Sequence, residues 1–324
     1  AVVAPSWHEG VLLVDLNNPQ GCSWVPSSVD DALSIGQSEL VMLGAHDTDL
    51  PGEHTIDEIT DAVVTGLADY CRKSGITSIV LGLSGGIDSA VAACVAVEAL
   101  GPSNVTGLAM PSRHSSQHSI DDAEYTATSL GMHHRVHSID GMHQATEHEF
   151  GTVLVDGHAV AGENLQARLR ALLVMGYANA QSSMAITTGN KSEIAQGYCT
   201  LYGDMAGGYA PLGDVYKMEV YAMAELFNRR AIDAGNAPPV NESTLTKPPS
   251  AELAPDQIDE DTLPPYALLD ELLRAHIELG MNAEQMVQHG YEAAMVADVL
   301  TRLERNEHKR WQMAPAPRVT SRAF

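Results

Sequence analysis

The order of apolar and polar residues predicts a chain in which strands and helices alternate from residue 55 onward. Thr55-Ile56-Asp57-Glu58 has the pattern of a capping box, and the apolar residues after it recur at helical spacing until Gly75. Short apolar, β-branched runs predict strands at residues 78–83, 105–110, 134–139 and 184–187, with helical patterns between them at 88–100, 121–130 and 164–181. Such alternation is typical of a doubly wound, mostly parallel sheet in an α/β fold.

The two ends of the chain have different patterns. Residues 1–54 are irregular apart from an alternating stretch at 10–16, which predicts one strand. Towards the C-terminus, helices are expected at 215–234 and, as two or three amphipathic pieces, from residue 266 to about residue 310. Residues 238–265 are rich in proline and acid, so we expect a loop or a lid there.

Charge narrows the set of partners. Asp and Glu number 42 against 18 Lys and Arg, which gives a formal net charge of −24 at pH 7. This excess disfavours a nucleic-acid-binding surface, because phosphate backbones attract the opposite charge. We attribute the excess to solubility, and adaptation to a saline habitat is the alternative.

The sequence contains no sign of secretion or of a membrane span. No apolar run approaches the ~18 residues that a membrane helix needs, and the first residues lack the basic region and apolar core of a signal peptide. The cysteines are scattered, with no C-x-x-C pair, which is typical of reduced thiols. They are Cys22, Cys71, Cys94 and Cys199. We therefore expect a cytoplasmic protein with no membrane or nucleic acid partner.

The stretch that joins the strand at 78–83 to the next helix carries the most chemistry. Ser84-Gly85-Gly86-Ile87-Asp88-Ser89 places two glycines at a helix N-terminus, where backbone N–H groups and the helix dipole favour phosphate. A carboxylate among phosphate donors is repulsive unless a cation lies between them, so Asp88 indicates Mg²⁺. The alternative is an ordinary βα turn with incidental glycines. In such sheets ligands bind beyond the carboxyl ends of the strands, where Ser84 and Pro111 both lie.

The hexapeptide 84–89 resembles the signature of the N-type ATP pyrophosphatases, the PP-loop family, which cleave ATP between its α and β phosphates. With four further stretches, the chain from about residue 70 onward resembles the NAD synthetases, specifically the synthetase domain of the glutamine-dependent kind. These stretches are 110–116, 163–168, 188–208 and 247–253. The resemblance implies an adenine nucleotide α hydrolase-like fold with C-terminal helices.

The resemblance also implies a two-step ligase reaction. The carboxylate of nicotinic acid adenine dinucleotide would attack the α-phosphate of ATP and release pyrophosphate. Ammonia would then displace AMP from the acyl-adenylate and give NAD. Such chemistry depends on positioning and on charge stabilisation more than on covalent help from the enzyme.

Residue roles follow from matching positions. ATP contacts would come from Ser84, Gly85, Gly86, Ser89, Met110, Arg113, Thr188, Lys217 and Ser250. Asp88 and Glu193 would ligate Mg²⁺ and, together with Lys217, form the catalytic set. The dinucleotide substrate would contact Asn164, Arg168, Lys191 and Asp204.

Some of these roles have ordinary structural alternatives. Glu193 is otherwise explained as a carboxylate that the dipole stabilises at a helix N-terminus, and Lys217 as a surface residue. Asn164 and Arg168, four residues apart, also fit a simple surface pair on one helix face. Two positions depart from the short ammonia-only enzymes. Ala109 replaces their Arg, which leaves Arg113 as the nearest basic residue, and Gly208 replaces their Asp, which favours the glutamine-dependent branch.

The nitrogen donor depends on the first 54 residues. We expect residues 1–54 to be the remnant of a nitrilase-like glutaminase domain plus a linker, because residues 7–15 look like its last strand, and residues 55–324 to be the synthetase domain. Cys22 and Cys71 lack the Glu and Lys context of a glutaminase nucleophile. Free ammonia is therefore the expected donor for this chain, and glutamine the donor in the intact two-domain enzyme.

The resemblance further implies a homodimer with the dinucleotide site at the subunit interface, and a larger oligomer remains open for the intact enzyme. Two other functions also remain open. One is a different PP-loop adenylating ligase, such as a GMP synthetase-like enzyme, which would lack the stretch 188–193. The other is a non-catalytic nucleotide-binding protein, which would not need two metal ligands.

Overall fold

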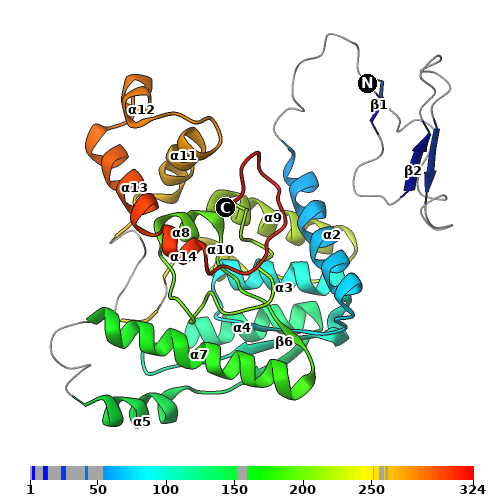
Figure 1. The fold of residues 1–324 in the computed structure, drawn as a ribbon. Coiled ribbons are helices and arrows are strands. Elements are labelled where there is room, and N and C mark those ends of the chain that lie inside the picture. Colours follow the sequence, from blue (N-terminus) through cyan, green and yellow to red (C-terminus); the bar gives the residue numbers. More distant parts are fainter. Residues whose placement is uncertain are drawn as a thin grey trace. The chain divides into compact units, whose positions relative to one another are not determined.

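The computed structural model describes residues 2–3, 10–13, 23–26, 41–42, 54–151, 159–250, 252–254, 259 and 262–324 (Figure 1). The chain divides into two compact units, residues 1–62 and 63–324. The predicted boundary between residues 54 and 55, and the relation of the first part to a glutaminase, stay predictions.

The first unit contains two antiparallel strand pairs. β1 (Val2–Val3) pairs with β4 (Val41–Met42), and β2 (Gly10–Leu13) pairs with β3 (Ser23–Pro26). The strand predicted at 10–16 is present over its first part, and residues 14–16 and Cys22 lie outside the described residues. The predicted capping box begins α2 (Ile56–Ser74): Thr55 N donates to Glu58 Oε2 (2.8 Å), and Glu58 N donates to Thr55 Oγ1 (3.3 Å).

A four-stranded parallel sheet forms the centre of the second unit. Its strands are β5 (Ile79–Gly82), β6 (Val105–Ala109), β7 (His133–Val136) and β8 (Met184–Ala185). They lie in the order β7-β6-β5-β8, so the chain order across the sheet is 3-2-1-4. This order is that of a doubly wound sheet, with its topological switch point between β5 and β8. The predicted fold class is confirmed.

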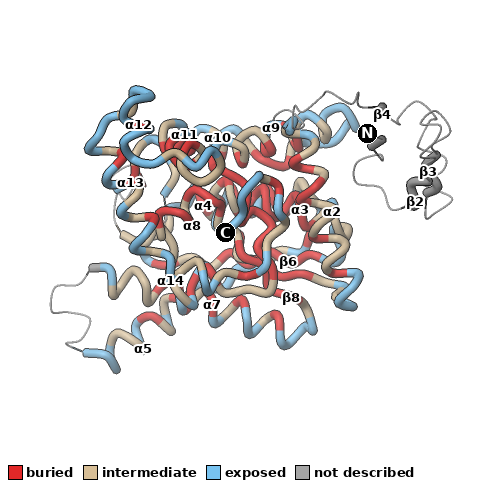
Figure 2. The backbone as a smooth tube through the Cα atoms, turned by 45° about the horizontal axis from the view of Figure 1, so that its top comes forward, coloured by how far each residue is buried: buried red, intermediate tan, exposed pale blue. Residues whose placement is uncertain are grey.

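Helices cover both faces of this sheet (Figure 1). Val80 and Leu108 pack against Val174 and Ala178 on α7 (Ala159–Gln181). Because neighbouring residues of a strand point to opposite faces, the buried strand residue Leu81 faces the other layer. That layer contains α3 (Ile87–Leu100) and α4 (Gln117–Leu130), and α9 (Lys217–Asp233) packs outside α3. The buried residues gather around these elements (Figure 2).

The C-terminal helices form a second core. α11 (Tyr266–Ile277), α12 (Ala283–His289) and α13 (Ala293–Arg305) pack together with the short α8 (Lys191–Gln196), and α14 (Glu307–Arg310) follows. The final segment then returns to the sheet side, where Ala210 N donates to Pro315 O (2.8 Å). Helices were expected here from residue 266 to about residue 310, and the structure confirms them.

Several elements differ from the sequence prediction. α4 begins at Gln117 because Ser116 caps it, accepting from Ser119 N (3.2 Å). Residues 238–265 include a short helix, α10 (Glu242–Thr246). α5 (Asp140–Phe150) was not predicted. Its sequence has no apolar stripe, and it forms because it packs on α7.

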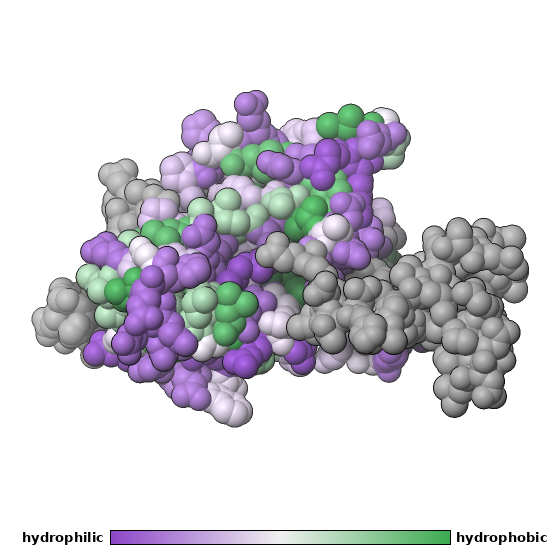
Figure 3. Space-filling model, turned by 90° about the horizontal axis from the view of Figure 1, so that it is seen from above, coloured by the Kyte–Doolittle hydropathy of each residue, from purple (hydrophilic) through white to green (hydrophobic). Residues whose placement is uncertain are grey.

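Hydrophilic residues are prominent on the described surface (Figure 3). On the face in Figure 3, hydrophilic residues cover much of the described surface and separate several small apolar patches. In the part of the chain that the structure describes, no helix is both long enough and apolar enough to cross a membrane. The described cysteines, Cys71, Cys94 and Cys199, are free thiols.

Candidate functional site at the switch point of the sheet

The loop between β5 and α3 folds as the Ser-Gly-Gly motif predicts. Gly86 N donates to Ser84 Oγ (3.2 Å), and Ser89 Oγ donates to Gly86 O (2.9 Å). The hydroxyls of Ser84 and Ser89 lie 3.1 Å apart, which ties the loop to the first turn of α3. Ser84 is exposed and Ser89 is buried. The loop thus presents the N-terminus of a 14-residue helix, a geometry that suits a phosphate group.

Gly85 needs both its positive φ and its missing side chain. Its φ is +78°, and a Cβ here would lie 2.1 Å from the backbone O of Ser119 at the start of α4.

We expect Gly85→Ala to lower the free energy of unfolding by about 3 kcal/mol or more, and to abolish ATP binding, because the loop and α4 must move apart. Gly75→Ala is the matched control, since Gly75 has φ +69° and open space around it. It should cost only about 1–2 kcal/mol. Equal losses in denaturant titrations would contradict this account.

The three predicted catalytic residues meet at the carboxyl ends of β5 and β8. Lys217 Nζ, on the first residue of α9, donates to Asp88 Oδ2 (2.6 Å) and to Glu193 Oε1 (3.0 Å). Asp88 follows β5 in the first turn of α3, and Glu193 follows β8 in α8. The side chain of Lys217 is 2% exposed, so the surface-residue alternative for this lysine is wrong.

Burial and charge act against each other in this cluster. Burial lowers the pKa of Lys217, but Asp88 and Glu193 outweigh burial, and the pKa lies well above its usual range. Burial raises the pKa of Glu193, the Asp88 carboxylate raises it further, and Lys217 opposes both. One ammonium therefore lies between two carboxylates, and with both carboxylates ionised the cluster has a net negative charge.

Asn190 holds the two carboxylate-bearing helices together. Its Oδ1 accepts from Glu193 N (3.0 Å) as the N-cap of α8, and its Nδ2 donates to Asp88 Oδ1 (2.8 Å). Beside it, Ser192 Oγ accepts from the backbone N of Lys217 (3.0 Å). The start of α8 is thus fixed to both α3 and α9. The sequence prediction missed Asn190, although its place before a short helix is an N-cap pattern.

Three of the predicted substrate contacts surround one turn. Thr200 Oγ1 donates to Asn164 Oδ1 (2.7 Å), Arg168 Nε donates to Leu201 O (3.2 Å), and Thr200 N donates to Asp204 Oδ1 (2.6 Å). The structure therefore brings Asn164, Arg168 and Asp204 together through residues 200–204. Asn164 and Arg168 share one face of α7. Their side chains form hydrogen bonds with the turn at 200–204 and not with each other.

Lys191, the fourth predicted substrate contact, lies apart from these three. Its ammonium is fully buried, 2.7 Å from Asp214 Oδ1, and donates to Thr320 Oγ1 (2.6 Å) and Arg322 O (2.8 Å). An ammonium has three N–H donors, and these partners occupy all of them. The placement argues against direct contact between Lys191 and the dinucleotide, and it gives the residue a structural role.

The remaining predicted ATP contacts are placed less tightly. Met110 packs against the core beside Val80, and Thr188 is half-buried after β8. Arg113 Nη2 donates to Glu147 Oε2 (2.8 Å) and lies 3.2 Å from His143 Nδ1, so its guanidinium is engaged with α5. Contact of these residues with ATP stays a prediction.

Glu252 fixes the segment that contains Ser250, another predicted ATP contact. The Glu252 carboxylate accepts from Ser116 N (3.3 Å) and Ser119 Oγ (2.6 Å) at the N-terminus of α4, and Ser250 Oγ accepts from Glu252 N (3.1 Å). Lys247 Nζ lies 3.2 Å from Asp122 Oδ2 on the same helix. No sequence pattern predicts these contacts of Glu252, because its partners are more than 130 residues away.

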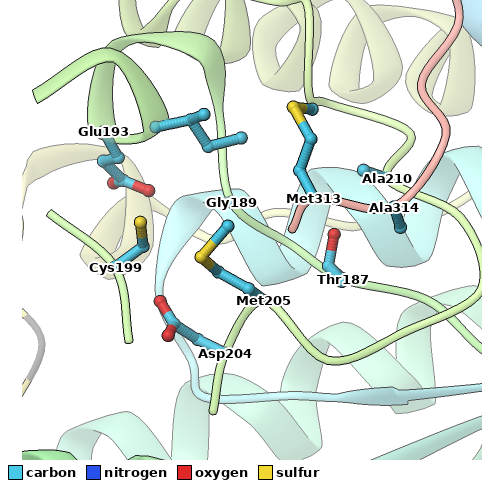
Figure 4. A pocket seen from close by; sticks show the side chains of 10 residues that line it. Thr187, Gly189, Glu193, Cys199, Asp204, Met205, Ala210, Met313 and Ala314 are labelled. Carbon is cyan, nitrogen blue, oxygen red and sulfur yellow. The ribbon is translucent and has the colours of Figure 1, made fainter. Parts of the chain in front are cut away.

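A pocket connects the ion-pair cluster with the turn at 200–204. Figure 4 shows the side chains of Glu193, Cys199 and Asp204 along one side of it, with Met313 and Ala314 from the C-terminal segment opposite. The cavity therefore has a predicted metal ligand and a predicted substrate contact on one wall. Cys199 has a raised pKa because of burial, so it is no activated nucleophile.

Fold and site together define a PP-loop α/β protein: a glycine loop and a helix N-terminus at the switch point, with paired carboxylates beside them. The chain belongs to the NAD synthase family, whose model matches residues 59–313. Glutamine-dependent NAD(+) synthetase of Rhodobacter capsulatus is 42% identical over 331 residues, which cover 100% of this chain and 56% of that protein. The chain spans about half the length of the curated relatives it matches.

Solved structures of the family resemble this fold. The glutamine-dependent NAD+ synthetase of Acinetobacter baumannii, determined with ADP, is 35% identical with a TM-score of 0.58, covering 88% of this chain and 50% of that one. The NH3-dependent NAD synthetase of Campylobacter jejuni is 28% identical with a TM-score of 0.64. The NMN synthetase of Francisella tularensis is 29% identical with a TM-score of 0.66. The last two matches each cover 79% of this chain and 96% of the other.

Proposed function

We propose that this chain amidates nicotinic acid adenine dinucleotide to NAD, with ATP converted to AMP and pyrophosphate. The observation that carries the proposal is the cluster of Asp88, Glu193 and Lys217 beside the phosphate loop. A protein that only bound a nucleotide would have no need of two buried carboxylates at its phosphate site. Family membership supports the ligase over other adenylating enzymes.

The donor set fits one Mg²⁺ bound together with a nucleotide. Mg²⁺ in such sites takes one or two carboxylates plus phosphate oxygens and water, and Asp88 and Glu193 supply two carboxylates. Among the described residues no group of three acidic, histidine or cysteine side chains could hold an ion alone, which agrees with a metal that arrives with phosphates. When bound, Mg²⁺ would neutralise charge on the phosphates of ATP.

The residues of the chain would position two substrates around one phosphorus. The N-terminus of α3 and the hydroxyl of the exposed Ser84 would hold the leaving pyrophosphate, and Ser89, whose hydroxyl donates to Gly86 O, would keep the loop in shape. Lys217 would supply positive charge for the phosphates. Residues 200–204, held by Asn164 and Arg168, would contact the dinucleotide. Acyl transfer to ammonia then needs a free carbonyl face and exclusion of water.

We infer that ammonia is the nitrogen donor, either free or released from glutamine by a glutaminase domain. The NH3-dependent neighbour, almost all of which this chain covers, supports the first part. The names of the curated relatives support the second. A cytoplasmic location stays part of the proposal.

The test is an assay of pyrophosphate and NAD from nicotinic acid adenine dinucleotide, ATP and Mg²⁺, with ammonium chloride or glutamine. We expect NAD and pyrophosphate in equal amounts with ammonium, and NAD formation with glutamine only where a glutaminase domain is present. A parallel reaction with nicotinic acid mononucleotide tests whether the chain acts like its NMN synthetase neighbour. Pyrophosphate only with the substrate of GMP synthetase would favour that ligase. ATP binding with no pyrophosphate under any condition would favour a non-catalytic protein.

We propose in addition that the chain is a homodimer, with α7 in the interface. α7 carries apolar residues on all sides, including Leu172 and Met175, which are 62% and 40% exposed, and a helix of that kind is normally covered. Phe150 at the end of the adjoining α5 is 52% exposed.

We expect sedimentation velocity to give a dimer, and Leu172→Glu to give a monomer, because it places a charge in an apolar contact. Leu279→Glu is the matched control. Leu279 is 71% exposed just beyond α11, away from α7 in sequence and in contacts. A monomeric wild type, or a dimer that survives Leu172→Glu, would contradict α7 as the interface.

A further inference from the structure

Lys217 occupies the position between the two carboxylates that the proposed function assigns to Mg²⁺. Its Nζ lies 2.6 Å from Asp88 Oδ2 and 3.0 Å from Glu193 Oε1. The side chains of Asp88 and Glu193 are 18% and 15% exposed, and that of Lys217 is 2% exposed. All three charges are therefore largely removed from solvent. Charges interact more strongly in such surroundings than they do in water.

Two poorly hydrated carboxylates stay ionised only when a cation compensates them, because otherwise one of them takes up a proton. An unpaired buried charge is costly, and removal of one partner from a buried pair leaves the other uncompensated. A divalent ion between Asp88 and Glu193 would compensate both, but it would repel the ammonium that already lies there. Metal and ammonium are thus alternatives for one position.

The backbone of Lys217 is fixed at the start of α9, and its ammonium lies at the end of a four-carbon side chain. Its backbone N donates to Ser192 Oγ (3.0 Å), which anchors it at the start of α9, and its Nζ lies 5.0 Å from the ring centre of Tyr266. A lysine ammonium stands on a flexible four-carbon stem. The charge can leave the carboxylates without movement of the helix, provided that a new acceptor is present.

We propose that Lys217 is a built-in counter-ion that keeps the metal position filled until the nucleotide arrives. With a nucleotide bound, the phosphates would accept the ammonium, and Asp88 and Glu193 would be free to hold the divalent ion. The consequence is that the chain has little affinity for a free divalent ion, so that metal and nucleotide enter together. This inference rests on the proposed function only for the identity of the metal ligands.

The chain contains a matched control for this idea. Lys191 is a second buried lysine in the same region, but its ammonium is paired with one carboxylate, Asp214, and with Thr320 and Arg322. Replacing Lys191 also removes a buried positive charge. It does not leave two neighbouring carboxylates facing each other.

The experiment measures thermal unfolding without nucleotide, in millimolar MgCl₂ or in KCl of equal ionic strength. We expect MgCl₂ to raise the Tm of Lys217→Met by about 4 °C or more, because the ion binds the two carboxylates that no longer have an ammonium between them. Wild type and Lys191→Met should gain less than about 1 °C, since neither presents an open pair. Lys217→Met/Glu193→Gln should lose the response, because one of the two carboxylates is gone.

Every outcome decides the question. Equal MgCl₂ stabilisation of wild type and Lys217→Met would overturn the proposal, as would an equal gain in Lys191→Met. If Lys217→Met folds only in the presence of Mg²⁺, the proposal is supported, and failure to fold even then overturns it. Because no catalysis is measured, an inactive chain with the expected Mg²⁺ response would refute the proposed function and leave this inference standing.

Discussion

Asp88→Asn is expected to lower kcat for NAD formation by about 10²–10³-fold, the loss typical when one electrostatic contact to a transition state is removed. Asparagine keeps the shape of the side chain, and its oxygen can still accept from Asn190 Nδ2, as Asp88 Oδ1 does over 2.8 Å. The amide NH₂ replaces Oδ2, so both the negative charge and the acceptor that face Lys217 Nζ are lost. Steady-state rates of pyrophosphate release with saturating ATP and Mg²⁺ measure the effect.

Asp57→Asn provides the control for this substitution. Asp57 follows an isoleucine at the start of α2, as Asp88 does at the start of α3, and it is exposed. Both changes remove a carboxylate that favours the helix dipole, an effect of about 0.3–1 kcal/mol on stability. We expect Asp57→Asn to keep full activity. Comparable activity in the two variants would rule out Asp88 as a metal ligand.

Lys191→Met is expected to lower the free energy of unfolding by about 3–5 kcal/mol, as is usual when one partner of a buried ion pair is removed. Asp214 would stay buried with no charged partner, although Val319 N (2.8 Å) and Thr320 N (2.9 Å) still donate to it. The C-terminal segment loses its bonds from Thr320 and Arg322 to the ammonium. Urea titration followed by circular dichroism gives the loss.

The exposed pair of Lys73 and Asp69 gives the comparison. Lys73 Nζ lies 3.0 Å from Asp69 Oδ2, but its side chain is 64% exposed. A pair of this kind contributes at most about 1 kcal/mol, so Lys73→Met should change stability little. If both lysine variants unfold at the same urea concentration as wild type, Lys191 is not the anchor of the C-terminal segment.

Sequence patterns were sufficient where the structure is set by neighbouring residues. The strand around Val80 is a continuous apolar run because both of its faces are covered. The loop at Ser84 to Ser89 is local, and its glycines have the geometry that the motif requires. The sequence analysis also grouped Asp88, Glu193 and Lys217 in one site. It did so only because the chain resembles a known family.

The sequence could not reveal contacts between distant segments. Lys191 lies in a stretch that contains predicted site residues, and only the fold brings it to Asp214 and Thr320, away from the pocket that Glu193 and Asp204 line. Arg113 looked like the free basic residue near ATP, yet α5, which has no clear apolar pattern, supplies Glu147 to it. Glu252 reaches α4 from another loop, and nothing in either stretch predicts that approach.

The position of Asn190 also restricts what can be encoded there. As an N-cap alone, Ser, Thr or Asp would do nearly as well as Asn. The second contact changes the choice, because the side chain must accept from Glu193 N and at the same time donate to Asp88. An ionised aspartate cannot donate and would add a third negative charge. Serine and threonine carry a single hydroxyl on a short side chain, which does not reach both helices. The two hydrogen bonds together therefore favour asparagine over the other N-cap residues at position 190.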